Sequence, residues 1–418
     1  MKDHNLLDLM TIHDVLADHL VRSVYQPIVR LDSGDICGFE ALARGPIGTP
    51  FENPEEMFAA ARSAQRDGEL DALCVTNAVR GAIGTLPTWC PLFVNVEPAT
   101  LNSELIERTA PIAAAGDRPI MLEVTERAIT RSLRTLLAGL ASAREHGWQI
   151  ALDDVGVEAG SLALLPVIRP DVVKLDMGLI RNQPDRELGR TMAAVMAYAE
   201  RTGATVLAEG IETDEHLERA LSLGATLGQG YRFGRPAPLD ADVAALPNCH
   251  VPLPAWPTER AVALSPYDAI IAAGCVPGVA RKNVLLQISH HLEDQAFSDP
   301  NAPLLLSAFQ AAPNLTRATR VRYAALAEHC ALVAALGIGI APEPVPGVQG
   351  AVIHDGDALA GEWSVVVLGP HYCGALVGKD LGDTHCGEPD RRFSYVVTHD
   401  RELVELAAES LLRRLHAT

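Results

Sequence analysis

Basic residues are scarce in this chain of 418 residues, in which 34 lysines and arginines stand against 53 aspartates and glutamates and leave a formal charge of −19 at pH 7. This excess of negative charge argues against a protein that binds nucleic acid by neutralising its phosphates, and against one that binds an anionic membrane. No run reaches about 18 uninterrupted apolar residues, so we expect no membrane span. The N-terminus lacks a basic stretch followed by an apolar core, so we expect no secretory signal.

Closely paired cysteines are also lacking, because none of the eight forms a CxxC motif. Most of them lie in apolar runs, which indicates buried free thiols of a protein in a reducing cytoplasm. We therefore expect a cytoplasmic location. The eight are Cys37, Cys74, Cys90, Cys249, Cys275, Cys330, Cys373 and Cys386.

The length allows two domains, a barrel of about 250 residues and a second domain of roughly 150. Hydrophobic residues make up 48% of the chain, which is enough for sizeable cores. A proline-rich stretch near residue 250 is typical of a semi-rigid linker. We expect a first domain over 1–247, a linker over 248–264 and a second domain over 265–418.

Strand-like runs alternate with helix-like stretches through the first domain, as is typical of a parallel sheet. The first two runs are joined by the turn residues 32–35, so they predict an antiparallel hairpin. Eight runs with one antiparallel start indicate an α/β fold, a modified TIM-type (β/α)8 barrel. The runs span 24–31, 36–44, 91–97, 119–126, 148–156, 171–176, 205–212 and 227–234.

Acidic or amide side chains stand at the ends of these runs. In a closed parallel barrel the carboxyl ends of the strands converge on one face, where such barrels hold their chemistry. Ligand sets rich in oxygen and free of sulfur suit Mg²⁺ or Mn²⁺. The pattern predicts a metal-dependent site. Its members are Glu40, Asn95, Glu123, Asp153, Asp154 and Glu209.

The same positions resemble the signature of EAL-type cyclic-di-GMP phosphodiesterases, beginning with Glu40-Ala41-Leu42. The resemblance continues in order and spacing for about 210 residues. Its motifs are YQPIV (25–29), VNVE (94–97), LEVTE (122–126), LDDVG (152–156), VKLD (173–176), AEGIET (208–213) and GQGYRFGRP (228–236).

The resemblance implies a role for each matched residue. The metal ligands would be Glu40, Asn95, Glu123, Asp153 and Asp154. Lys174 would lie near the attacking water, and Glu209 would act as general base or hold a metal-bound water. Gln26, Arg44 and Gln229 would contact the dinucleotide. Glu126 would steady the loop after the paired aspartates. The family also implies a homodimer.

Two Mg²⁺ or Mn²⁺ ions could clamp a phosphodiester for in-line attack by water, which would yield linear pGpG. The loop after the aspartates departs from the usual DDFGTGYSSL, because this chain has DDVGVEAGSL at 153–162. A catalytically weak cyclic-di-GMP sensor and a dimerising scaffold therefore stand as alternatives to a working enzyme.

The second domain resembles the DICT domain, a sensory module, in stretches such as 304–310 and 362–380. We expect a smaller α/β domain that could regulate the barrel. Its helix candidates are 282–297, 318–335 and 399–416, and its strand candidates are 350–354, 363–369, 373–380 and 391–399. His371, Cys373, His385 and Cys386 lack zinc-type spacing, so we expect ordinary residues there and no metal site.

Overall fold

The computed structural model of the protein describes residues 10–97, 100–115, 118–125, 133–157, 159–254, 256, 264–383 and 387–416. The chain divides into two compact units, one containing the barrel and the other a C-terminal sheet. Within the described residues, no helix is both long and apolar enough to cross a membrane.

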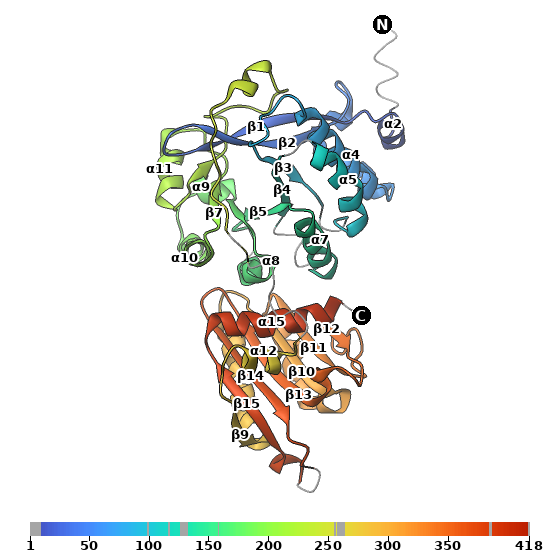
Figure 1. The fold of residues 1–418 in the computed structure, drawn as a ribbon, viewed down its shortest axis with the longest axis vertical. Helices are drawn as coiled ribbons and strands as arrows, with labels where there is room; N and C mark the ends of the chain where they lie inside the picture. The colour runs from blue at the N-terminus through green and yellow to red at the C-terminus, as the bar shows by residue number, and fades with distance from the viewer. Residues whose placement is uncertain are drawn as a thin grey trace. The chain divides into compact units, whose positions relative to one another are not determined.

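The first unit is built on a closed barrel of eight strands in chain order (Figure 1). Strand β1 runs antiparallel to both of its neighbours, β2 and β8, whereas every pair from β2 to β8 is parallel. The predicted modified (β/α)8 barrel is confirmed. The strands are β1 Arg22–Arg30, β2 Ile36–Arg44, β3 Leu92–Asn95, β4 Ile120–Thr125, β5 Gln149–Val155, β6 Val172–Leu175, β7 Thr205–Ala208 and β8 Leu227–Gly228.

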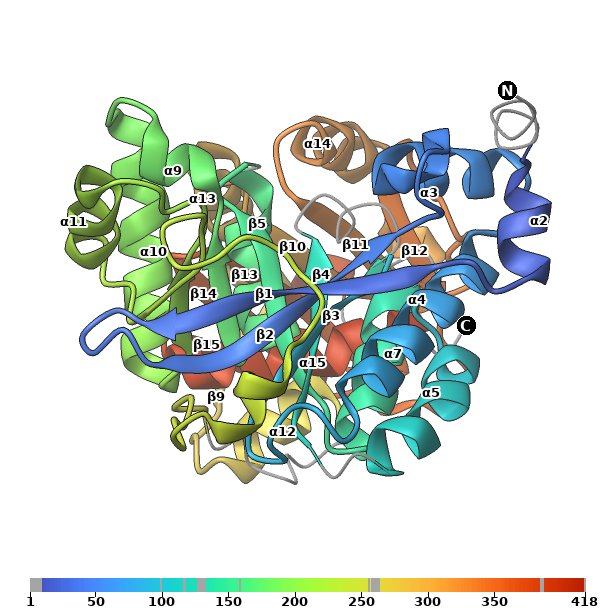
Figure 2. The same cartoon turned by 90° about the horizontal axis from the view of Figure 1, so that it is seen from above.

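Helices alternate with these strands along the chain and flank the barrel, with α4, α5 and α7 on one side and α9, α10 and α11 on the other (Figure 2). Local signals set several of their ends. Asn53 caps α3 by accepting a hydrogen bond from the Glu55 amide, and Pro54 follows it in the first turn. The helices of this unit are α2 Ile12–Ala17, α3 Pro54–Ser63, α4 Asp67–Ala82, α5 Ser103–Ala115, α7 Leu133–Glu145, α9 Met177–Arg181, α10 Arg186–Thr202 and α11 Asp214–Ser222. The short helix α8 Leu165–Ile168 belongs to the second unit.

The barrel interior contains a layer of buried apolar side chains directly beneath the polar strand ends. On six strands the apolar residue stands two positions before a predicted site residue, so alternation along the strand points both inward. These apolar residues are Phe93, Met121, Ala151, Val172, Leu207 and Leu227. The site therefore stands on a packed apolar floor.

Strand β2 joins this layer through a β-bulge. The pairing of β1 with β2 shifts between Ile28↔Gly38 and Val29↔Ile36, which leaves Cys37 as the extra residue. Cys37 is fully buried in the apolar layer and forms a disulfide with Cys249. The expectation that all the cysteines are free is therefore wrong for this pair, because the fold brings together two residues that lie 212 positions apart. Cys74, Cys90, Cys275, Cys330 and Cys373 are free.

The second unit is a mixed sheet of seven strands in the order β12-β11-β10-β13-β14-β15-β9. Helices α13 and α14 contribute to the apolar cluster on one face of the sheet, whereas α12 and α15 pack together on the other (Figure 1). The predicted α/β class is confirmed. Its elements are α12 Pro266–Ala272, β9 Gly278–Arg281, α13 Lys282–Ser298, β10 Leu304–Ala311, α14 Arg317–Ala327, β11 Leu332–Ile338, β12 Val348–Val352, β13 Glu362–Leu368, β14 Cys373–Asp380, β15 Arg392–Thr398 and α15 Arg401–His416.

One predicted helix of this unit is wrong in its second half. The sequence pattern favoured a helix over 318–335, but α14 ends at Ala327 and residues 332–338 form β11. Strand β11 lies between β10 and β12 and pairs in parallel with both. A short apolar run buried on both faces carries no alternation, so periodicity alone does not separate it from a buried helix.

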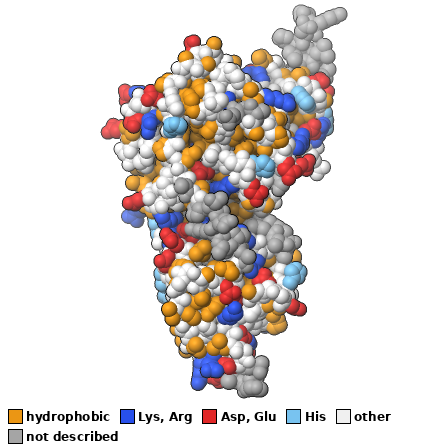
Figure 3. All heavy atoms as spheres, in the orientation of Figure 1, with side chains coloured by type: hydrophobic (Ala, Val, Ile, Leu, Met, Phe, Trp, Pro, Cys, Tyr) orange, Lys and Arg blue, Asp and Glu red, His pale blue; other side chains and the backbone are white. Residues whose placement is uncertain are grey.

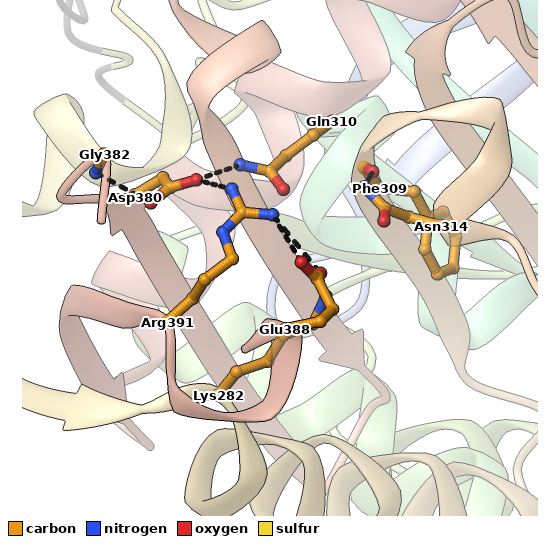
Figure 4. Close-up of polar contacts among 8 residues, drawn as sticks. All are labelled: Lys282, Phe309, Gln310, Asn314, Asp380, Gly382, Glu388 and Arg391. Carbon is orange, nitrogen blue, oxygen red and sulfur yellow. Dashed lines mark hydrogen bonds and ion pairs between the residues drawn. The ribbon is translucent and has the colours of Figure 1, made fainter. Parts of the chain in front are cut away.

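A network of ion pairs and hydrogen bonds joins the ends of β10 and β14 (Figure 4). The Arg391 guanidinium lies between two carboxylates, pairing with Asp380 and, at 3.1 Å, with Glu388. Gln310 at the end of β10 donates a hydrogen bond of 3.5 Å to Asp380. Lys282 pairs with Glu388 from the start of α13. The charges here balance one another within the unit.

Candidate active site

The predicted site residues converge at the carboxyl ends of the barrel strands. Lys174 on β6 is fully buried, and its ammonium nitrogen Nζ lies at the centre of the group. The distances from Nζ are 2.6 Å to Glu123 Oε1, 2.7 Å to Glu209 Oε1, 3.0 Å to Asp153 Oδ1 and 3.9 Å to Glu40 Oε2. Four carboxylates from four different strand ends therefore surround one cation.

This crowding shifts the proton affinities of the group. Burial acts to lower the pKa of Lys174, but Asp153, Glu123 and the other carboxylates outweigh it and hold that pKa well above its ordinary value. Burial, with the negative charge of Glu40, raises the pKa of Glu123 well above its usual range. Burial also raises the pKa of Glu209 to about 8, against the opposing effect of Lys174.

Two side-chain amides, those of Asn95 and Gln229, donate hydrogen bonds to the Glu40 carboxylate on β2. Asn95 Nδ2 donates to Glu40 Oε1 at 2.8 Å, and Gln229 Nε2 donates to Glu40 Oε2 at 2.6 Å. Gln229 also donates to Gln26 Oε1 at 3.1 Å, and Gln26 in turn donates to the Gly234 carbonyl. Burial acts to raise the pKa of Glu40, but Lys174 and these amides hold it below the ordinary value.

The paired aspartates occupy a strained position at the end of β5. Asp154 has φ of 58°, in the left-handed region that non-glycine residues seldom adopt. Such strain gathers at functional sites, where the surrounding structure maintains it. Ligand atoms of Asp153, Asp154 and Glu209 lie within 4.8 Å of one another. Within the described residues, this is the group of three or more acidic, histidine or cysteine ligands that is close enough to hold a metal ion.

The charge and chemistry of the site fit divalent cations. Four carboxylates lie within 3.9 Å of the single ammonium of Lys174, and that of Asp154 lies beside those of Asp153 and Glu209. The five carboxylates leave four negative charges in excess when all are ionised. Every donor is an oxygen atom, as hard cations such as Mg²⁺ and Mn²⁺ prefer. The excess charge equals that of two divalent ions.

A cavity of about 290 Å³ opens beside this group, between β2, β3 and helices α3 and α4. Glu40, Asn95 and Arg44 line it, so Arg44 lies next to the acidic group, where it donates a hydrogen bond to the Ala43 carbonyl at 2.7 Å. Burial lowers the pKa of Arg44. Arg44 and Asn95 can donate hydrogen bonds to an anionic ligand in the cavity, whereas Glu40 and Glu97 add negative charge to its lining.

The same cavity is lined by Asp71, which the sequence analysis missed. Asp71 is buried in α4, where it accepts hydrogen bonds from the Glu97 amide and the Thr100 hydroxyl. Burial raises the pKa of its carboxyl to about 7. A carboxylate in the middle of a helix gives no sign in the sequence that it faces a site, so only the packing of α4 against β3 reveals it.

Some of the predicted functional positions lie outside the described residues. Glu126 is one of them. His385 and Cys386, which were expected to be ordinary residues, and Glu158 in the loop after the paired aspartates also lie outside the described residues. Cys373 donates a hydrogen bond to the His399 carbonyl and belongs to none of the metal-ligand groups found among the described residues.

On the face shown in Figure 3, basic side chains are scattered among acidic ones.

The family model of the EAL domain matches residues 12–236, which is more than half of the chain. The chain belongs to the EAL domain family. Downstream of this EAL domain, residues 270–381 match the model described as the sensory domain in diguanylate cyclases and two-component system, DICT. The resemblance to both families is confirmed.

Curated relatives match the EAL domain at similar levels of identity. An uncharacterized signaling protein of Caulobacter vibrioides is 30% identical over 235 residues, which cover 54% of this chain and 29% of that protein. The cyclic di-GMP phosphodiesterase RocR of Pseudomonas aeruginosa is 29% identical over 222 residues, covering 51% of this chain and 57% of RocR. The chain thus spans less than two thirds of these relatives.

Solved structures also align with the EAL domain. A manganese and cyclic-di-GMP complex of BlrP1 from Klebsiella pneumoniae is 31% identical, covers 52% of this chain and 56% of that one, and has a TM-score of 0.46. The PaMucR phosphodiesterase in complex with cyclic-di-GMP is 24% identical, covers 54% of this chain and 96% of that one, and has a TM-score of 0.49.

Proposed function

We propose that this EAL domain hydrolyses cyclic-di-GMP to linear pGpG. The observation that carries the proposal is the group of four carboxylates around Lys174, with Asp154 beside two of them, in a chain that belongs to the EAL family. Relatives of the domain include proteins named as cyclic di-GMP phosphodiesterases, RocR and NbdA of Pseudomonas aeruginosa. A site so rich in carboxylates needs cations before it can accept an anionic phosphodiester.

Five residues would hold two divalent cations, Mg²⁺ or Mn²⁺, through their oxygen atoms. Bound ions of this kind supply Lewis acidity, which offsets the charge of a phosphodiester and lowers the pKa of water. The proposed ligands are Glu40, Asn95, Glu123, Asp153 and Asp154.

Lys174 and Glu209 would act on the attacking water. Their side chains lie 2.7 Å apart, so a water that contacts both could donate a proton to the Glu209 carboxylate while Lys174 holds its oxygen. Lys174 is enclosed by the strand ends and cannot swing away to solvent. This enclosure keeps the water in one orientation relative to the phosphorus.

Arg44, which lines the cavity, would bind a phosphate of the substrate. Its guanidinium can donate two hydrogen bonds to the nonbridging oxygens of a phosphodiester. Gln229 donates hydrogen bonds to Glu40 and Gln26, and the amides of both glutamines would contact the dinucleotide. We further propose that the protein is a cytoplasmic homodimer whose barrel is regulated by the DICT domain.

Turnover of cyclic-di-GMP with Mn²⁺, followed by chromatography of pGpG, tests the proposal. Glu40→Ala should abolish product, because it removes a proposed ligand and the acceptor of two amide hydrogen bonds. Glu218→Ala is the matched control, since this exposed glutamate lies on α11. Binding of cyclic-di-GMP without product would identify a sensor instead, and the absence of both would leave a scaffold.

A further inference from the structure

The chain that leaves the barrel returns across the apolar floor beneath the active site. Residues 247–254 form this segment, which we call the strap; it contains no helix or strand. Cys249 is buried in the same apolar cluster as Phe93 and Met121, and Val251 and Leu253 pack against it. The strap thus closes the barrel at the end opposite the candidate site.

Few polar contacts hold the strap in place. The Thr205 hydroxyl donates a hydrogen bond to the Pro252 carbonyl. Among the described residues, no backbone hydrogen bond joins residues 247–254 to the barrel. Three of the eight strap residues are prolines, which have no amide hydrogen to donate. Apart from the apolar packing of the strap, the Cys37–Cys249 disulfide is therefore its main attachment to the barrel strands.

We propose that Cys37 and Cys249 form a redox-sensitive latch, which fastens the strap when the cysteines are oxidised and releases it when they are reduced. Cys37 is rigidly placed at the β2 bulge, whereas Cys249 belongs to an irregular segment. Cys37 therefore stays in place when the bond is broken, whereas Cys249 is free to move with the strap. Release would lengthen the free chain that leads towards the DICT domain.

The reductant is a dithiol. Its thiolate attacks Sγ of Cys249, which is 5% exposed, whereas Cys37 is fully buried. The S–S bond breaks, and Cys37 departs as a thiolate that takes up a proton. The second thiol of the reductant then displaces Cys249 from the mixed disulfide, so the protein gains two thiols and the reductant leaves as a disulfide.

Alkylation and limited proteolysis of the full chain test the latch. In protein purified without reductant and then unfolded, Cys37 and Cys249 should resist alkylation until dithiothreitol is added. In the folded protein, dithiothreitol should speed cleavage by proteinase K within residues 247–254 at least tenfold, while strands β3 to β7 stay uncut. Mass spectrometry detects both changes without any assay of catalysis.

Two variants complete the test. The double variant Cys37→Ser with Cys249→Ser should show fast cleavage of the strap without dithiothreitol and no response to it. Cys275→Ser, which removes a free thiol elsewhere, should respond as the wild type does. Alkylation of Cys37 and Cys249 without reductant would overturn the proposal. So would resistance of the folded disulfide to dithiothreitol, or a rate of strap cleavage that is unchanged after reduction.

Discussion

Replacing Lys174 with methionine should destabilise the barrel strongly when no divalent cation is bound. Methionine preserves the length and apolar stem of the side chain but removes the ammonium. In the wild type that ammonium lies within 3.0 Å of three carboxylate oxygens and has no exposure to solvent. The substitution leaves the carboxylates facing one another in a site of low dielectric constant.

The expected magnitude follows from the burial of the group. Removing one partner of a buried ion pair costs about 3–5 kcal/mol, because the remaining charge is left uncompensated. For a domain of this size, this corresponds to a fall in melting temperature of about 10 °C. Urea and thermal unfolding in the presence of EDTA would measure the loss.

The control and the metal dependence make this prediction specific. Lys379→Met removes an ion pair with Asp268 in which the lysine is 45% exposed, so we expect a loss below about 1 kcal/mol. Mn²⁺ should stabilise Lys174→Met more than the wild type, since cations then supply the missing positive charge. A Lys174→Met protein as stable as the wild type in EDTA would refute the close packing of carboxylates around Nζ.

Two further predictions concern the DICT domain and the cavity. Burial raises the pKa of Glu362 to about 7 from 4.5, so its contribution to stability is present below pH 4.5 and is lost as the pH rises through 7. The free energy of unfolding of Glu362→Gln, relative to that of the wild type, should therefore increase by about 3 kcal/mol from pH 4.5 to pH 8. Urea unfolding of both proteins at the two pH values measures this, and a difference that does not change with pH would contradict the prediction. Arg44→Ala should raise the KM for cyclic-di-GMP about 10- to 100-fold, because a hydrogen bond to a charged group contributes about 1.5–3 kcal/mol. Arg80→Ala on α4 is the control, and an unchanged KM for Arg44→Ala would place the phosphate elsewhere.

The candidate site was largely predictable because its residues stand at the ends of short apolar strands. Each strand end is a local pattern, and a closed parallel barrel brings all such ends to one face. Glu123, Asp153 and Glu209 could therefore be placed near Lys174 before any distance was known. The distances confirm the convergence.

Other features depend on contacts between distant parts of the chain. Asp71 faces the cavity because α4 packs beside β3, and β11 is a strand because β10 and β12 pair with it on both sides. Neither arrangement leaves a periodic signal in the residues themselves. The sequence analysis therefore missed the first and extended a helix into the second.

The short apolar runs, each ending in a polar residue, determined the barrel and its acidic rim, since this order is a property of neighbouring residues. The tertiary structure alone decided which cysteines meet and that the Lys174 ammonium lies within 3.0 Å of three carboxylate oxygens. Cys37 and Cys249 are separated by 212 residues, and their encounter depends on a bulge and on the path of the chain after the last strand. Such pairings arise from closure of the whole barrel, which no short stretch of sequence encodes.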